Sequence, residues 1–123
     1  MSALLYVGSS LVTLWGIAHV FPTQGVVKDF GDITEDNKRI ITMEWLMEAV
    51  LMITIGVFVI VVTAIDNTSD EAIAVYSVAS GSLVVMAVIS LFTGSRIAFL
   101  PFRLCPVIFT ISAILIALGA GFS

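Results

Sequence analysis

Four long runs of apolar residues dominate the chain, and short polar segments separate them. The runs extend from about Ala3 to Phe21, Ile41 to Ile65, Ala72 to Phe92 and Leu104 to Phe122. About 20 residues of α-helix rise roughly 30 Å, which is the thickness of a bilayer's hydrocarbon core. The runs lack the strict alternation of barrel strands. The pattern therefore predicts an all-α integral membrane protein, with residues 1–123 forming one four-transmembrane-helix bundle.

The composition supports this prediction and narrows the possible partners. Hydrophobic residues make up 59% of the chain and charged residues 11%, and the mean hydropathy is +1.15, values that are foreign to soluble domains. No positive charge precedes the first run and no cleavage site follows it, so we expect a retained helix. No basic patch or aromatic platform exists for nucleic acid. We expect a multi-pass protein of the cytoplasmic membrane, in contact with membrane lipids and other integral membrane subunits.

The basic residues predict the orientation. All five lie in two of the three connections, at Lys28, Lys38, Arg39, Arg96 and Arg103. By the positive-inside rule, residues 22–40 and 93–103 form cytoplasmic loops. Both termini and the short 66–71 connection are then outside.

The connections carry helix-capping and helix-breaking signals. In the first, Asp32 or Thr34 can cap a short helix that contains Glu35, and in the second Ser69 or Asp70 can cap the third transmembrane helix. The third connection contains Pro101, which we expect to interrupt helical structure, whereas Pro106 is tolerated in the first turn of the last helix. We place the arginines of this connection at lipid phosphates or partner carboxylates.

Small residues form stripes on three of the predicted helices. Such stripes let transmembrane helices approach closely. They predict a compact bundle, or one that also packs against neighbouring subunits. The stripes comprise Gly8 and Gly16 on the first helix, Ser77 and Gly81 on the third, and Ala113, Ala117 and Gly121 on the fourth.

Two carboxylates interrupt the second apolar run near its cytoplasmic end. Glu44 and Glu48 lie on one helix face, because residues four apart stack above each other. An ionised side chain facing lipid costs a few kcal/mol or more, so we expect this face to point into protein, with Glu48 buried. We expect His19, on the glycine face of the first helix, to point inward too.

The predicted topology brings several polar and aromatic side chains to the cytoplasmic half of the bundle. One interpretation is a structural ion-pair network, and another is the polar end of a pocket for a lipophilic molecule such as a quinone. A metal site is not expected, because one histidine is too few for the known carboxylate bundles. No catalytic residue set can be assembled. The candidates are His19, Glu44, Glu48, Arg96 and Arg103, with Trp15 and Trp45 as walls.

Four segments resemble a known family: Trp15 to His19, Phe30 to Ile33, Asp36 to Trp45, and Phe92 to Pro106. They look like the small four-span accessory subunit associated with the ammonia monooxygenase of ammonia-oxidising archaea. The resemblance implies a non-catalytic accessory subunit of a copper membrane monooxygenase. The copper would lie in partner subunits, with no cofactor bound by this chain.

The four-helix outline is also similar to the DoxX-like redox membrane proteins. That resemblance implies a stand-alone protein that binds a lipophilic redox ligand such as a quinone. A small proton-coupled transporter that uses Glu48 is a further alternative, although small four-helix exporters carry their carboxylate in the first helix.

Overall fold

The computed structural model describes residues 2–97 and 100–121, and almost all of them are helical. Four helices are long and apolar enough to cross a membrane. This confirms the predicted all-α architecture with four helices of spanning length. The elements are α1 (Ser2–Val20), α2 (Thr23–Asp29), α3 (Glu35–Ile65), α4 (Asp70–Phe92), the 3₁₀ turn η1 (Gly94–Arg96) and α5 (Leu100–Gly121).

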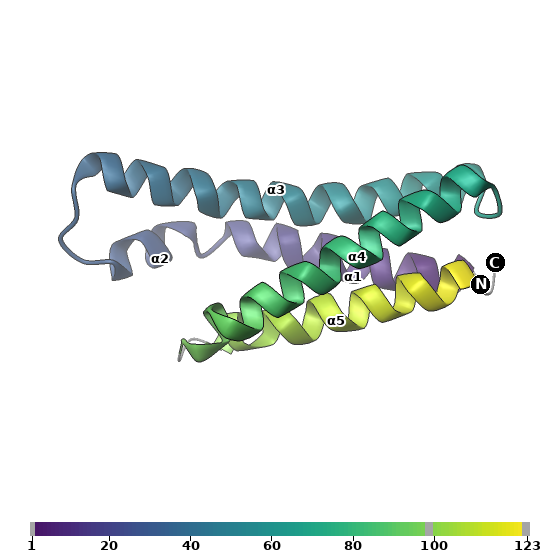
Figure 1. Cartoon of the computed structure of the whole chain (residues 1–123). Coiled ribbons are helices and arrows are strands. Elements are labelled where there is room, and N and C mark those ends of the chain that lie inside the picture. Colours follow the sequence, from purple (N-terminus) through teal and green to yellow (C-terminus); the bar gives the residue numbers. More distant parts are fainter. Residues whose placement is uncertain (1, 98–99, 122–123) are drawn as a thin grey trace.

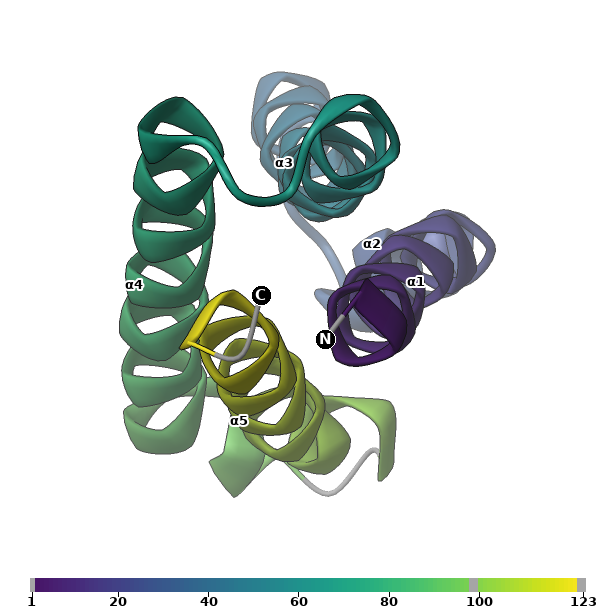
Figure 2. The ribbon, with the colours of Figure 1, turned by 90° about the vertical axis from the view of Figure 1, so that its right-hand side faces the viewer.

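The four long helices surround a common core, as the end-on view in Figure 2 shows. The first helix packs extensively against both α3 and α5, and α4 packs along α5. The contact between α3 and α4 is much smaller. In Figure 1, α4 begins beside the end of α3 and then inclines away from it, so the two helices diverge toward the end that carries α2.

The two ends of the bundle carry different connections. The first residues of α1, the last residues of α5 and the α3–α4 turn lie at one end (Figure 1). The short helix α2 and the turn η1 lie at the other. This grouping matches the predicted grouping of the loops, while their orientation across a membrane stays a prediction.

Glycines make the tight helix crossings of the core. A Cβ atom on Gly16 would lie 2.9 Å from Cβ of Met52, and one on Gly56 would lie 2.6 Å from the carbonyl oxygen of Ser9. The backbones of α1 and α3 therefore approach at two levels, which only residues without a side chain permit. Gly8 plays the same role between α1 and α5, where an added Cβ would lie 2.9 Å from Cβ of Leu115.

Both predicted helix caps form, but one of them starts a longer helix than expected. The hydroxyl of Thr34 accepts a hydrogen bond from the Asn37 N–H at 3.1 Å. It caps α3 itself, which begins at Glu35 and not at Ile41. The hydroxyl of Ser69 accepts from the Ala72 N–H at 3.1 Å and caps α4. Glu35 therefore does not belong to a separate short helix, because the acidic first turn of α3 continues directly into the apolar run.

The last helix also begins earlier than predicted. It starts at Leu100, so Pro101 lies in the first turn and does not interrupt the helix. A proline is favourable there because the first helical N–H groups have no intrahelical partner in any case. Pro106 is an interior residue of α5 rather than a first-turn residue.

Part of the predicted small-residue surface is not used inside the chain. Ser77 and Gly81 of α4 are exposed, and a Cβ on Gly81 would meet nothing within 4 Å. Ala117 and Gly121 of α5 are exposed as well, whereas Ala113 is buried. The predicted notch on α4 is therefore open in the chain, because the buried face of α4 consists of other residues, namely Ala72, Tyr76, Ala79, Leu83 and Ala87.

Candidate functional site

The single histidine lies in the last turn of α1 and is held by a tryptophan of α3. His19 is 8% exposed, which confirms that it points inward. Its ring stacks on Trp45, with centroids 3.8 Å apart and planes 17° from parallel. The indole N–H of Trp45 also donates a hydrogen bond to the His19 carbonyl oxygen at 2.8 Å. That carbonyl is among the last of the helix and has no intrahelical partner, so Trp45 both caps α1 and fixes the imidazole.

Glu48 is the carboxylate that faces this imidazole. Its Oε2 atom lies 3.7 Å from Nε2 of His19, within ion-pair distance but too far for a hydrogen bond. The Glu48 side chain is 44% exposed, so the prediction that it is buried is wrong for the chain alone. The seam with α1 runs through Ala49 and Gly56 instead, because small residues permit the closest approach.

The Nε2 atom of His19 has no hydrogen-bond partner and is buried. The side chain is 6% exposed, so solvent does not satisfy this atom. Two serine hydroxyls, of Ser80 and Ser112, share this condition within residues 2–97 and 100–121. A helical serine hydroxyl rotates easily toward a carbonyl of the preceding turn. The imidazole lacks that freedom because Trp45 holds it, so its Nε2 atom is the polar group that needs a partner.

The other charged candidates lie at the same end but outside this contact. Glu44 is exposed. Nε of Arg103 donates a hydrogen bond to the Ile97 carbonyl oxygen at 3.2 Å, and Arg96 is exposed in η1. Across the described part of the chain, the ion pairs are His19–Glu48, Lys38–Glu35 and Arg39–Asp36. An ion-pair network in which an arginine neutralises Glu48 is therefore not formed.

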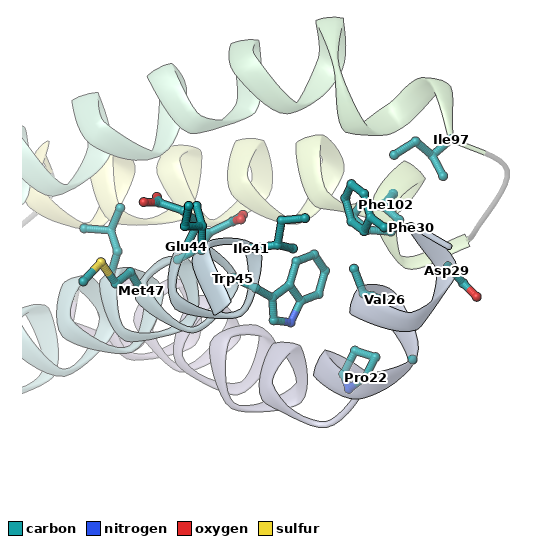
Figure 3. Close-up of a pocket in the computed structure, with 14 residues that line it drawn as sticks. Pro22, Val26, Asp29, Phe30, Ile41, Glu44, Trp45, Met47, Ile97 and Phe102 are labelled. Atoms are coloured by element: carbon teal, nitrogen blue, oxygen red, sulfur yellow. The ribbon is translucent and has the colours of Figure 1, made fainter. Parts of the chain in front are cut away.

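A broad groove opens at this end between α2, α3 and the segment that leads into α5. It has a volume of about 920 Å³, and we call it the outer groove. Figure 3 shows that Ile41 and Trp45 of α3, Val26 and Phe30 of the α2 segment and Phe102 of α5 line it. Asp29 lies at the outer rim and points outward (Figure 3). Glu44 and Glu48 also line the groove.

Two smaller spaces lie beside the outer groove and share lining residues with it. The inner cavity, about 340 Å³, is lined by His19 and Glu48 together with residues of α4 and α5. The tryptophan cavity, about 130 Å³, is lined by Trp15, His19 and Trp45. Glu48 lines both the outer groove and the inner cavity. The divergence of α4 from α3 thus leaves the His19–Glu48 pair at the wall of the inner cavity, with Glu48 also facing the outer groove.

Two residues of the site were not among the sequence candidates. Phe102 lines all three spaces and meets the Trp45 ring edge-on, with centroids 5.5 Å apart. Cys105 is buried, and its sulfur accepts a hydrogen bond from the Trp15 indole N–H at 3.4 Å. Their positions follow from the early start of α5. The one sequence signal was Pro101, a residue that also favours a helix start.

The chemistry available at the site is hydrogen bonding and charge. No set of three or more histidine, cysteine, aspartate or glutamate side chains is placed to hold a metal ion within the described residues. What the site offers a ligand is one imidazole nitrogen, a carboxylate beside it, and aromatic and aliphatic walls. These features suit a molecule with a small polar end and a large apolar part.

The fold and the site define a helical protein with four helices of spanning length and a histidine–glutamate pair at the mouth of an internal cavity. In comparisons with known proteins, no protein family, curated protein or solved structure matches this chain. The function is therefore inferred from the geometry of the site itself.

Proposed function

We propose that the chain is a multi-pass protein of the cytoplasmic membrane that binds a lipophilic molecule in the outer groove and inner cavity. The polar end of this ligand contacts His19 and Glu48. The observation that supports this is the buried Nε2 atom of His19, which lacks a partner and belongs to a side chain that lines the inner cavity. A buried polar atom without a partner costs about 1–3 kcal/mol, and a ligand that hydrogen-bonds it recovers much of that.

The size and lining of the spaces suit such a ligand. Pockets for small molecules are typically about 300–1,000 Å³ and mostly apolar, with a few polar groups that fix orientation. The outer groove provides the volume, and Leu51 and Phe102 line both the groove and the inner cavity. A quinone has this character, because its carbonyl oxygens accept hydrogen bonds, the hydroxyl groups of its reduced form donate them, and its tail is apolar.

Native mass spectrometry of the chain from its own membrane tests this function. We expect a small lipophile to remain bound to the wild-type chain. Leu51→Trp, which fills the junction between groove and cavity, should remove it. Val50→Trp is the matched control, because Val50 is 60% exposed and lines neither space. Wild-type chain without any bound lipophile would contradict the proposal.

A second function is favoured by a separate observation. The small-residue notch of Ser77 and Gly81 on α4 is open in the chain, and such notches pack against other helices in membranes. Together with the family resemblance, this supports a non-catalytic accessory subunit of a larger membrane complex, whose other subunits would be those of a copper membrane monooxygenase. Purification with a larger subunit in fixed ratio and no lipophile would support this function against the first.

The third alternative, a proton-coupled transporter, gains no support from the packing. Between the site and the end of the bundle that carries the termini, core side chains of all four long helices are completely buried, including Val12, Val59, Leu83 and Ile116. A carboxylate that serves transport needs access to both sides of the membrane, whereas Glu48 faces only the outer groove and the inner cavity.

A further inference from the structure

We propose that the ligand of this site is a lipophilic amine, bound as its ammonium cation. This inference rests on the proposed function and names the chemical class of its ligand. It follows from the charge of the outer groove, from the position of the basic residues and from the groups that surround the His19–Glu48 pair.

The outer groove is acidic. Its charged lining residues are Asp29, Glu44 and Glu48, and no lysine, arginine or histidine lines it. Glu44 and Glu48 are one helical turn apart, about 6 Å along the axis of α3. Two carboxylates so close, beside apolar walls that lower the local dielectric, favour a cation and disfavour an anion.

The basic residues of the same end do not neutralise these carboxylates. Two of them pair with acids of the first turn of α3: Nζ of Lys38 lies 3.4 Å from Glu35, and Nη1 of Arg39 lies 3.9 Å from Asp36. Arg103 donates to a backbone carbonyl. Lys28 and Arg96 lie outside the lining of the groove. Among the described residues, no lysine or arginine is therefore paired with Glu44 or Glu48.

The neutral groups of the site also suit an ammonium ion. Phe30, Trp45 and Phe102 present aromatic rings at the groove, and such rings attract cations. The partnerless Nε2 atom of His19 accepts a hydrogen bond when the imidazole is neutral with its proton on Nδ1. An ammonium N–H can donate to this nitrogen and to the Glu48 carboxylate 3.7 Å away. A quaternary ammonium has no N–H and therefore cannot donate a hydrogen bond to either group.

A matched pair of fluorescent probes tests the inference on the full chain in nanodiscs of zwitterionic phosphatidylcholine. Pyrenemethylamine and pyrenemethanol share one ring system and differ in the ammonium and hydroxyl groups. Energy transfer from tryptophan to pyrene reports binding, because Trp45 lines the groove. Nanodiscs that contain an unrelated tryptophan-bearing membrane helix correct for partition into lipid.

We expect the amine to bind about tenfold more tightly than the alcohol at low salt, since two partly exposed carboxylates each contribute up to about fivefold. The Glu44→Gln/Glu48→Gln double variant should bring the ratio close to one. Glu71→Gln, which removes an exposed acid at the other end of the bundle, should leave the ratio unchanged.

The outcomes separate this inference from the proposed function. Equal, protein-dependent binding of both probes, or a ratio that survives in the double variant, overturns the lipophilic amine and leaves lipophile binding in place. Binding of neither probe above the lipid control overturns both. The amine is supported if the amine-to-alcohol affinity ratio falls to about one in the double variant and not in Glu71→Gln. Binding of the alcohol to the double variant then shows that the groove is still folded.

Discussion

At the residue scale, Trp45 does more than form a wall of the site. It caps the end of α1 through the His19 carbonyl oxygen and stacks on the imidazole, so one side chain joins two helices and orients the polar group of the cavity. An isolated hydrogen bond of this kind contributes modestly, but its loss leaves a carbonyl of a helix end without a donor.

Replacing this tryptophan tests its capping role. Trp45→Phe keeps a ring against His19 and removes the indole N–H, so we expect the free energy of unfolding to fall by about 1 kcal/mol. Trp15→Phe is the control, because the indole of Trp15 donates to the sulfur of Cys105, a weak acceptor. Its cost should be smaller. Equal losses in detergent unfolding experiments would contradict a capping role for Trp45.

The exposure of Glu48 changes what neutralising it should do. A half-exposed carboxylate at 3.7 Å from a histidine behaves as a surface pair, which is worth at most about 1 kcal/mol. We therefore expect Glu48→Gln and Glu44→Gln to lower the unfolding free energy by similar, small amounts. A loss of several kcal/mol for Glu48→Gln alone would show that this carboxylate is buried in the membrane state.

The sequence predicted some of these residues for sound physical reasons. A lone histidine on a glycine face and an acid in an apolar run both demand a polar environment, and His19 and Glu48 do meet. The role of Phe102 could not be predicted, because an aromatic residue between prolines fits a lipid-facing loop as well as a cavity wall. The interpretation in which an arginine pairs with Glu48 is wrong, since lying at one end of a bundle does not bring side chains into contact.

At the element scale, Gly56 makes the tighter of the two glycine crossings between α1 and α3. A Cβ on Gly56 would collide with Oγ1 of Thr13 and crowd the Ser9 carbonyl. Thr13 in turn donates a hydrogen bond to that carbonyl at 2.7 Å. The closest approach of the two helices is therefore incompatible with any side chain at position 56.

A pair of glycine substitutions tests this seam. Gly56→Ala should lower the unfolding free energy by about 1–3 kcal/mol, because overpacking a tight crossing forces the helices apart. Gly81→Ala has open space around its Cβ and should be neutral or stabilising by up to about 1 kcal/mol, since alanine favours helix over glycine. Detergent unfolding of both variants measures the difference. Equal effects would contradict the proposed seam.

Helix boundaries show where the sequence pattern was insufficient. The apolar runs located all four long helices, but α3 begins earlier than its run, within polar residues, and α5 begins earlier than its run at Leu100. Hydropathy reports what can lie in lipid, and it does not report where backbone hydrogen bonding stops. The cap at Thr34 was the better signal for the start of α3.

At the scale of the whole molecule, the inclination of α4 produces the site. By diverging from α3, it leaves the inner cavity next to His19, whereas a parallel bundle would fill that space with side chains. No local pattern predicts this angle, because it depends on how α4 packs along α5. The orientation of the helices across the membrane, in contrast, is predicted from the distribution of basic residues alone.

Cysteine labelling tests the proposed orientation. In a Cys105→Ser background, cysteines at Ser2 and Asn67 should react with an impermeant reagent in intact cells, and one at Thr34 should not. The start of α1 and the α3–α4 turn, which hold the first two, lie at one end of the bundle, and the start of α3, which Thr34 caps, lies at the other (Figure 1). Labelling of the cysteine at position 34 alone would show that the orientation is the reverse of the predicted one. Labelling of all three cysteines would contradict a membrane-spanning bundle.

The central claim is that a lipophile contacts Nε2 of His19, and nitrogen NMR of the imidazole tests it most directly. The chain contains one histidine, so ¹⁵N-histidine labelling of a tag-free protein in nanodiscs gives one pair of ring resonances. We predict that pyrenemethanol or pyrenemethylamine shifts the Nε2 resonance saturably, and that Leu51→Trp abolishes the shift. An Nε2 resonance that stays unchanged with both probes, under conditions in which they have fully partitioned into the nanodiscs, would contradict the account.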